Sequence, residues 1–315
     1  MYDTIIIGAG PAGFTAGIYA ARREMKTLII GKEAGGQLVW ASEIENYPGF
    51  KKIDNFDLIV KMQEQVKDLG VEMVTGEVQR IEKGEDDNFK IVTSSEEYQA
   101  KTVIVAMGLS PRRLEIPGEK ELNARGVTYC ANCDGPFYRD KKVAVVGGGN
   151  SALDAAEVLS KIASKVYLVH RKDTFRAFEY LVDEVKTKDN IELVLNSEIK
   201  KISGEEKVNK ITVLNNKENK EKDINVDGVF IEIGRIASTD LVENLVERDQ
   251  KMQILIDEKC HTKTDGLFAC GDVTQVPFKQ ITIACGQATI AALAAYEYLQ
   301  SKQGKKANVI LDRSH

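Results

Sequence analysis

Two cysteines separated by two residues, Cys130 and Cys133, are followed directly by Asp134. At the start of a helix this spacing lets the two thiols close a small, easily reduced ring, and the helix dipole lowers the pKa of a thiolate there. A carboxyl group next to the pair favours a catalytic redox site. Asp134 could instead be a structural N-cap, and the sequence leaves both roles open.

Besides redox chemistry, the cysteine pair could bind a metal ion or could be an incidental pair of buried thiols. A zinc site would need a second close pair of ligands, and the sequence has none. We expect Cys260, Cys270 and Cys285 to be small buried hydrophobic residues. The pair also lies only a short segment before a nucleotide-binding motif, which favours redox chemistry over both alternatives.

The elements that must position this chemistry begin with a glycine loop near the N-terminus. Gly8, Gly10 and Gly13 follow an apolar strand at residues 4–7 and open a helix that we expect to end at Ala21. Such glycines let a pyrophosphate approach the backbone while the helix N-terminus faces its charge. A single copy would be weak evidence, because a glycine turn occurs in other α/β proteins.

A second copy of the same pattern strengthens the interpretation. Gly147 and Gly149, with Asn150 and Ser151, follow an apolar strand at 143–146 and open a helix to about residue 162. Each copy continues into another strand, at 27–30 and 165–169, and each has a later apolar strand that closes on glycine, at 103–108 and 229–234. The internal duplication therefore predicts two nucleotide-binding folds.

The residues at the end of the second strand of each copy indicate which nucleotide binds. In the first copy this position is Gly31 rather than an acidic residue, so sugar contacts would come from neighbours such as Lys32 or Glu33. In the second copy it carries a basic cluster: His170, Arg171, Lys172 and Arg176. Cationic side chains there bind a 2′-phosphate and favour NADPH over NADH, although a solvated basic turn is the alternative.

The predicted fold is α/β, with two Rossmann-like dinucleotide-binding domains of the three-layer ββα type, the second inserted into the first. Residues 1–113 and 243–315 form an FAD-binding domain, and residues 114–242 form an NADPH-binding domain that carries the cysteine pair. Short alternating strands at 71–99 and 191–226 suggest a three-stranded antiparallel appendage in each half. We also expect helices at 51–69 and at about 287–299.

Composition limits the class of protein. The chain has 315 residues and a net charge of -5, which gives no footprint for nucleic acid. No apolar stretch approaches the roughly 18–20 residues needed to span a bilayer, and the first strand leaves no room for a signal peptide. We therefore expect a cytoplasmic protein.

From end to end, the chain resembles the low-molecular-weight, two-domain thioredoxin reductases of the pyridine nucleotide-disulfide oxidoreductase family. The matching segments are residues 8–13, 35–38, 45–50, 130–134, 147–152, 170–176 and 266–272. The position of the cysteine pair, just before the second glycine motif, is the most specific of them. In this family the redox pair belongs to the NADPH domain, whereas larger disulfide reductases carry it near the N-terminus.

The resemblance implies roles for single residues. Cys133 would face the flavin, Cys130 would attack thioredoxin and Asp134 would be the general acid. Residues implied to lie at the FAD are Gly8, Gly10 and Gly13 on the pyrophosphate, Gly36, Gln37 and Asn46 near the flavin ring, Gly271 and Asp272 at the ribityl chain, and Lys279 and Gln280 near the flavin. Residues implied to lie at the NADPH are Gly147, Gly149, Asn150, Ser151, His170, Arg171, Lys172 and Arg176.

Three residues depart from the family pattern. Lys172 and Lys279 replace arginines, and Pro136 is typical of the related alkyl hydroperoxide reductase flavoprotein. The implied function is electron transfer from NADPH through FAD and the cysteine pair to thioredoxin, in a homodimer. Alternatives are a peroxidase-system reductase with a glutaredoxin-like partner, a ferredoxin- or deazaflavin-dependent enzyme, a disulfide oxidase, and a non-enzymatic flavin-binding module.

Overall fold

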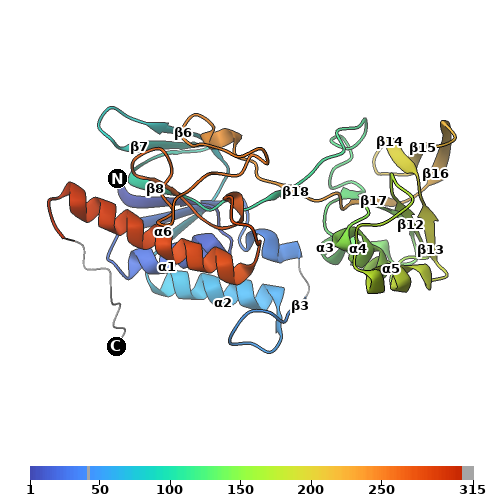
Figure 1. The fold of residues 1–315 in the computed structure, drawn as a ribbon, viewed down its shortest axis with the longest axis horizontal. Helices are drawn as coiled ribbons and strands as arrows, with labels where there is room; N and C mark the ends of the chain where they lie inside the picture. Colours follow the sequence, from blue (N-terminus) through green and yellow to red (C-terminus); the bar gives the residue numbers. More distant parts are fainter. Residues whose placement is uncertain (41–42, 307–315) are drawn as a thin grey trace. The chain divides into compact units, whose positions relative to one another are not determined.

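A computed structural model describes residues 1–40 and 43–306 (Figure 1). The chain divides into two compact units, one made of Met1–Ser110 and Ala237–His315 and the other of Pro111–Ile236. The second unit is therefore an insertion in the sequence of the first. Both units contain parallel sheets with helices, so the predicted α/β class is confirmed.

The first unit is built on a seven-stranded sheet of order β5-β2-β1-β8-β7-β6, in which β19 also pairs with β8. Its mutually parallel strands are β1 (Tyr2–Ile7), β2 (Thr27–Gly31), β5 (Glu72–Thr75), β8 (Glu97–Val105) and β19 (Leu267–Ala269). The strand β7 (Phe89–Thr93) pairs antiparallel with the first half of β8, and β6 (Val78–Lys83) pairs antiparallel with β7. The prediction that the antiparallel appendage begins at residue 71 is therefore wrong for its first strand, β5. β5 joins the parallel sheet, because Met73 and Val74 pack on its opposite faces.

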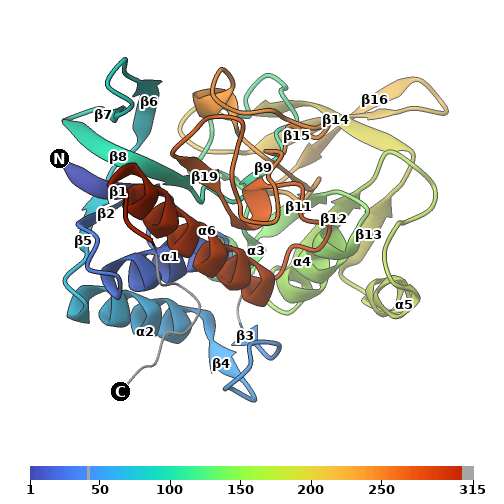
Figure 2. The same cartoon turned by 60° about the vertical axis from the view of Figure 1, so that its left-hand side comes forward.

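Alternate side chains of the parallel strands pack against different layers. Ile6, Ile29 and Ile104 face the helices, whereas Ile5, Leu28 and Val103 pack with the antiparallel strands. The helices are α1 (Pro11–Ala21), α2 (Asn55–Asp68) and α6 (Ile281–Lys302), and Figures 1 and 2 show α1 and α6 side by side. Burial of the strands on both faces gives the expected three layers.

The two helices predicted in this unit differ from expectation at their starts. α2 begins at Asn55 rather than near residue 51, because the Asp54 side chain accepts the N–H groups of Phe56 and Asp57. α6 begins at Ile281, before the predicted residue 287, and runs through Gly286. Its buried alanines, including Ala288 and Ala292, allow close packing, so tertiary contact extends the helix beyond its strongest sequence signal.

The second unit contains a five-stranded parallel sheet of order β10-β17-β11-β12-β13. Its strands are β10 (Val127–Thr128), β11 (Lys142–Val146), β12 (Lys165–Val169), β13 (Ile191–Val194) and β17 (Gly228–Ile231). One face packs on α4 (Asn150–Ser160) and α5 (Glu179–Lys186). The other packs on a three-stranded antiparallel sheet of β14 (Ser197–Ser203), β15 (Lys210–Asn215) and β16 (Lys220–Asn225). The predicted appendage therefore starts after β13, which belongs to the parallel sheet.

Short elements complete the chain. They are β3 (Glu43–Ile44), β4 (Ile53–Asp54), β9 (Ser110–Pro111), β18 (Arg235–Ile236), α3 (Ala131–Asp134) and the 3-10 turns η1 (Gly36–Trp40), η2 (Gly135–Tyr138), η3 (Asp240–Val242) and η4 (Gly271–Val273). Within residues 1–40 and 43–306, no helix combines the length and apolar character that crossing a bilayer requires.

Candidate active site

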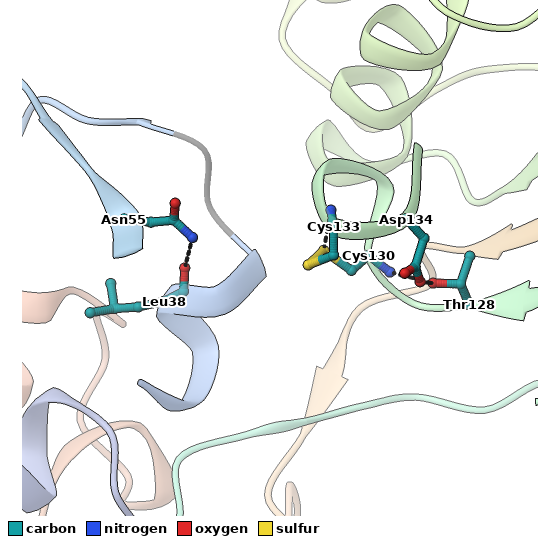
Figure 3. The surroundings of a disulfide bond; sticks show 6 residues. All are labelled: Leu38, Asn55, Thr128, Cys130, Cys133 and Asp134. Carbon is teal, nitrogen blue, oxygen red and sulfur yellow. Dashed lines mark hydrogen bonds between the residues drawn. A yellow bond between two sulfur atoms is a disulfide. The ribbon is translucent and has the colours of Figure 1, made fainter. Parts of the chain in front are cut away.

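The cysteine pair lies where strand β10 of the second unit gives way to the short helix α3. Cys130 and Cys133 are joined in a disulfide with their Cα atoms 5.4 Å apart (Figure 3). Cys130 is the N-cap of α3, and its Sγ accepts the N–H of Cys133 at 3.0 Å. The pair is therefore at a helix start, as predicted.

Asp134 is the last residue of α3, and its carboxylate points back to the strand. The Thr128 hydroxyl donates a hydrogen bond to Asp134 Oδ2 (Figure 3). The side chain caps neither α3, whose N-cap is Cys130, nor the following turn η2. Asp134 is thus the N-cap residue of η2 by position, but its side chain makes no capping hydrogen bond and is bound to Thr128 instead.

The second glycine loop lies in the same unit and has the shape that a pyrophosphate requires. A Cβ on Gly147 would lie 2.3 Å from the Glu232 carbonyl oxygen, and one on Gly148 would collide with the His170 ring at 2.2 Å. Gly149 is the N-cap of α4 and has open space where a side chain would project. No side chain caps α4 and its first turn holds no acidic residue, so its N–H groups suit an anion.

The basic cluster lies beside this loop but differs from expectation at His170. Its imidazole packs over Gly148, stacks on Phe175 and contacts the Thr174 carbonyl oxygen at 3.1 Å. Burial, together with the neighbouring cations, lowers the pKa of His170 and so disfavours its charged form.

The other three cations of the cluster are exposed. Arg176 is fixed next to the loop because its N–H donates to the Gly148 carbonyl oxygen at 2.7 Å. In the described part of the chain, the side chains of Arg171, Lys172 and Arg176 make no hydrogen bond or ion pair with protein groups. The Asn150 side chain accepts the N–H of Phe178 at 2.9 Å, and Ser151 is exposed in the first turn of α4.

The first glycine loop, in the other unit, is even more tightly built. A Cβ on Gly13 would lie 1.8 Å from the Gly8 carbonyl oxygen, and one on Gly8, at φ +119°, would lie 2.3 Å from that of Ala106. Gly10 is the uncapped N-terminus of α1, and the nearest atoms to its missing side chain are 3.7 Å away. These features fit the pyrophosphate of FAD.

Gly31, where dinucleotide-binding folds usually have an acidic residue, has a steric reason for being glycine. A Cβ at this strand end would lie 2.6 Å from that of Ala9 in the glycine loop. An acidic side chain could not be placed here without moving the loop. Of the two neighbours predicted to contact the sugar, Lys32 pairs with Glu77 at 2.7 Å and Glu33 is exposed.

Hydrogen bonds bring the other predicted FAD residues together from distant segments. Gln37 Nε2 donates to Asp272 Oδ2 at 2.8 Å, and Asn46 Nδ2 donates to Gln280 Oε1 at 3.1 Å. Lys279 Nζ donates to the Thr274 carbonyl oxygen at 2.7 Å, and burial lowers its pKa. Two glycines shape the same region: Gly36, at φ +53°, lies against Gly10, and Gly271 is at φ +77°.

The remaining cysteines are partly as expected. Cys260 and Cys270 are buried, and burial raises the pKa of each thiol, that of Cys260 to about 12. Cys285 is only partly buried: it packs against the helix-side core and also interacts with Thr15 and Tyr47, so the expectation holds only in part at this position. Its place near the start of α6 faces the beginning of α1, where its Sγ lies 3.9 Å from the Pro11 carbonyl oxygen.

Two residues near these sites were missed by the sequence analysis. Thr128 precedes the cysteine pair closely, and its position next to the pair was the only available signal. Glu232 follows β17, where its N–H donates to the Val146 carbonyl oxygen at 2.8 Å. Burial, helped by nearby Asp154 and opposed by Arg235, raises the pKa of Glu232 to about 7.

A buried carboxyl group of this kind makes stability depend on pH. Because its pKa is raised from 4.5 to about 7, Glu232 favours the folded state below about pH 4.5, and this contribution is lost as pH rises through 7. We expect Glu232→Gln to stabilise the protein at pH 8 by about 1–3 kcal/mol, with little effect at pH 4.5. Thermal unfolding at both pH values checks this, with exposed Glu221→Gln on β16 as control. The same change at both pH values would contradict it.

With this geometry established, sequence and structure comparisons place the chain among known proteins. Residues 2–288 match the protein family described as "Pyridine nucleotide-disulphide oxidoreductase". The chain belongs to this family. Members of the family named thioredoxin reductase use FAD and NADPH. The resemblance identified from the sequence is therefore confirmed.

Individual family members match over nearly the whole chain. The thioredoxin reductase of Bacillus subtilis is 39% identical over 306 residues, which cover 96% of each chain. The crystal structure of Lactococcus lactis thioredoxin reductase (FR conformation) is 40% identical, with a TM-score of 0.85 over 96% of this chain and all of the other. The crystal structure of T. acidophilum thioredoxin reductase is 34% identical in sequence, with a TM-score of 0.81. The match covers 96% of this chain and 99% of the other. The match to these two solved structures confirms the predicted fold of two dinucleotide-binding domains.

Proposed function

We propose that this protein reduces the disulfide of a thioredoxin or thioredoxin-like protein with electrons from NADPH. The observation that carries the proposal is the Cys130–Cys133 disulfide, which lies in the same unit as the second glycine loop and its basic cluster. A disulfide between cysteines three residues apart at a helix start is suited to opening and closing in each catalytic cycle.

The residues around the first glycine loop would hold FAD. Gly8, Gly10 and Gly13 leave room for its pyrophosphate, and Gln37 with Asp272 forms a polar edge nearby. The other predicted contacts of the flavin are Gly36, Asn46, Gly271, Lys279 and Gln280. When bound, FAD accepts a hydride from NADPH and supplies two electrons to a disulfide.

The cysteines and Asp134 would carry out the exchange with the partner protein. The Asp134 carboxylate takes the Cys130 proton, and the Cys130 thiolate attacks one sulfur of the partner's disulfide. A mixed disulfide forms, and the released sulfur takes the proton from Asp134. Asp134 then takes the Cys133 proton, and the Cys133 thiolate attacks Cys130 Sγ. The Cys130–Cys133 disulfide is restored, and the partner leaves as a dithiol once its second sulfur receives that proton.

NADPH would be bound by the second loop and its cations. Gly147, Gly149, Asn150 and Ser151 surround the expected pyrophosphate position at the start of α4. Arg171, Lys172 and Arg176 supply positive charge for the 2′-phosphate, and the His170 ring, which packs over Gly148, provides a flat surface between loop and cluster. An ammonium group at Lys172 offers a point charge where an arginine would offer a fork.

Comparing electron donors tests this function. We expect NADPH to reduce the bound flavin and to drive thioredoxin reduction much faster than NADH or reduced ferredoxin does. Arg171→Ala and Arg176→Ala should each weaken NADPH binding by about 1–3 kcal/mol, because each removes a charged contact to the phosphate. NADH binding should change little. Stopped-flow measurement of flavin reduction over a range of nucleotide concentrations gives these values.

The control for this comparison is an exposed cation of the same unit, Lys220 on β16, replaced by alanine. Equal rates with NADPH and NADH in the unmodified protein would show that the cluster is only a solvated turn. Faster reduction by ferredoxin, or reduction of a glutaredoxin-like protein but not thioredoxin, would assign a different donor or partner.

We also propose a cytoplasmic homodimer. Phe56 and Val60 lie one turn apart on α2 and are 59% and 48% exposed, which suits burial against a second copy. The thiols of Cys260, Cys270 and Cys285 are unpaired, as expected in a reducing compartment.

A further inference from the structure

The hydroxyl group of Thr128 links the two parts of the exchange machinery. Thr128 is buried at the end of β10, opposite Phe230 in the parallel ladder with β17. Its Oγ1 accepts the N–H of Cys130 at 3.2 Å and donates to Asp134 Oδ2 (Figure 3). One side chain thus contacts both the backbone of the cysteine and the carboxylate beside it.

The direction of these two bonds follows from the number of available hydrogens. The Cys130 N–H can only donate, so it occupies a lone pair of the Thr128 oxygen. The single hydroxyl hydrogen is then directed to Asp134 Oδ2. This oxygen acts as an acceptor, which leaves Oδ1 as the atom that can take up and release a proton.

Asp134 depends on this contact for its orientation. Within the described residues, its carboxylate makes no other hydrogen bond or ion pair. α3 has only four residues and continues directly into η2, and no capping hydrogen bond to η2 holds the Asp134 side chain. Without the Thr128 hydroxyl, the carboxylate would lose this hydrogen bond and could adopt other side-chain torsions.

We propose that Thr128 is a positioning residue that orients Asp134 for proton transfer to and from the sulfur atoms of the exchange. This inference rests on the proposed function, in which Asp134 is the acid and base. In this role Thr128 acts through Asp134, to which its hydroxyl is hydrogen-bonded.

Removing the hydroxyl group while keeping the side-chain shape tests the inference. In the holoenzyme, Thr128→Val should lower kcat for thioredoxin reduction by about 10- to 100-fold, part of what a positioned general acid contributes. KM for thioredoxin and the rate of flavin reduction by NADPH should stay unchanged. Thr128→Ser, which retains the hydroxyl, should recover kcat to within about threefold of the unmodified protein.

A double-variant cycle separates positioning from a purely structural role. Asp134→Asn alone should lower kcat, and adding Thr128→Val to it should cause no further loss, because the group on which Thr128 acts is already changed. The matched control is Thr212→Val, which removes a similar bond, Thr212 Oγ1 to Asp223 Oδ1 at 2.8 Å, on the antiparallel sheet of the same unit.

The possible outcomes are distinguishable. Additive losses in the double variant, or no recovery with Thr128→Ser, would show that Thr128 only supports the backbone and would overturn the inference. Full activity of Thr128→Val would overturn it as well. By contrast, failure of the unmodified protein to reduce thioredoxin with NADPH would refute the proposed function itself.

Discussion

Replacing Cys130 with serine is expected to abolish NADPH-driven thioredoxin reduction, lowering turnover by about a thousandfold or more. The disulfide with Cys133 cannot form without both sulfur atoms, so the electrons have no path to the partner. Cys133→Ser should cause the same loss. Turnover measured with NADPH and thioredoxin, with the flavin content of each variant verified first, checks both results.

The two cysteine variants are expected to differ in what they trap. Cys133→Ser keeps the Cys130 thiol, which should form a stable mixed disulfide with thioredoxin, visible on a non-reducing gel. Cys130→Ser should not form it. Because Cys130 is buried in the disulfide form, it must become exposed before the partner can reach it. The opposite trapping result would exchange the two roles. Cys260→Ala, a buried thiol of the other unit, is the control and should keep its turnover.

Replacing Gly13 with alanine is expected to yield protein that has lost nearly all of its FAD. The added Cβ would lie 1.8 Å from the Gly8 carbonyl oxygen, which no real contact permits, so the loop must open. Gly8 has little room to move aside, since an atom in its own Cβ position would lie 2.3 Å from the Ala106 carbonyl oxygen. The space and the N–H groups that would receive the pyrophosphate are then lost together. Flavin absorbance per chain after purification measures the effect.

The control for the glycine variant lies in the same unit. A Cβ on Gly76 would have its nearest neighbour at 4.0 Å, so Gly76→Ala should retain FAD. Binding of NADPH to the second unit, measured separately, shows whether a colourless Gly13→Ala protein is still folded. A folded Gly13→Ala protein with a full complement of FAD would mean that the flavin binds elsewhere.

Local sequence patterns predicted the secondary structure around the chemistry with little error. α1 ends at Ala21 and β12 covers Lys165–Val169, both as expected, because glycine turns and apolar runs of this kind leave few other conformations. The errors lie where distant packing decides. β5 and β13 join parallel sheets rather than the antiparallel appendages, because neighbouring strands are available to pair with them.

The candidate site shows the same division between local and distant effects. The placement of Cys130 at a helix start could be predicted from spacing alone, whereas the lowered pKa of His170 could not. It arises first from burial of the ring, which packs over Gly148, a contact that depends on how the strand end meets the glycine loop. The raised pKa of Glu232 has a similar origin in burial.

By itself, the sequence determined the two glycine loops, the redox pair and the basic cluster, because each depends on residues within one turn or strand end. The tertiary structure alone decided which side chains act together. Gln37 meets Asp272 from a segment far away in the chain, and Thr128 faces Asp134 because the end of β10 and the short helix α3 turn back on one another. Such contacts depend on strand register and side-chain burial, which arise only when distant segments pack together.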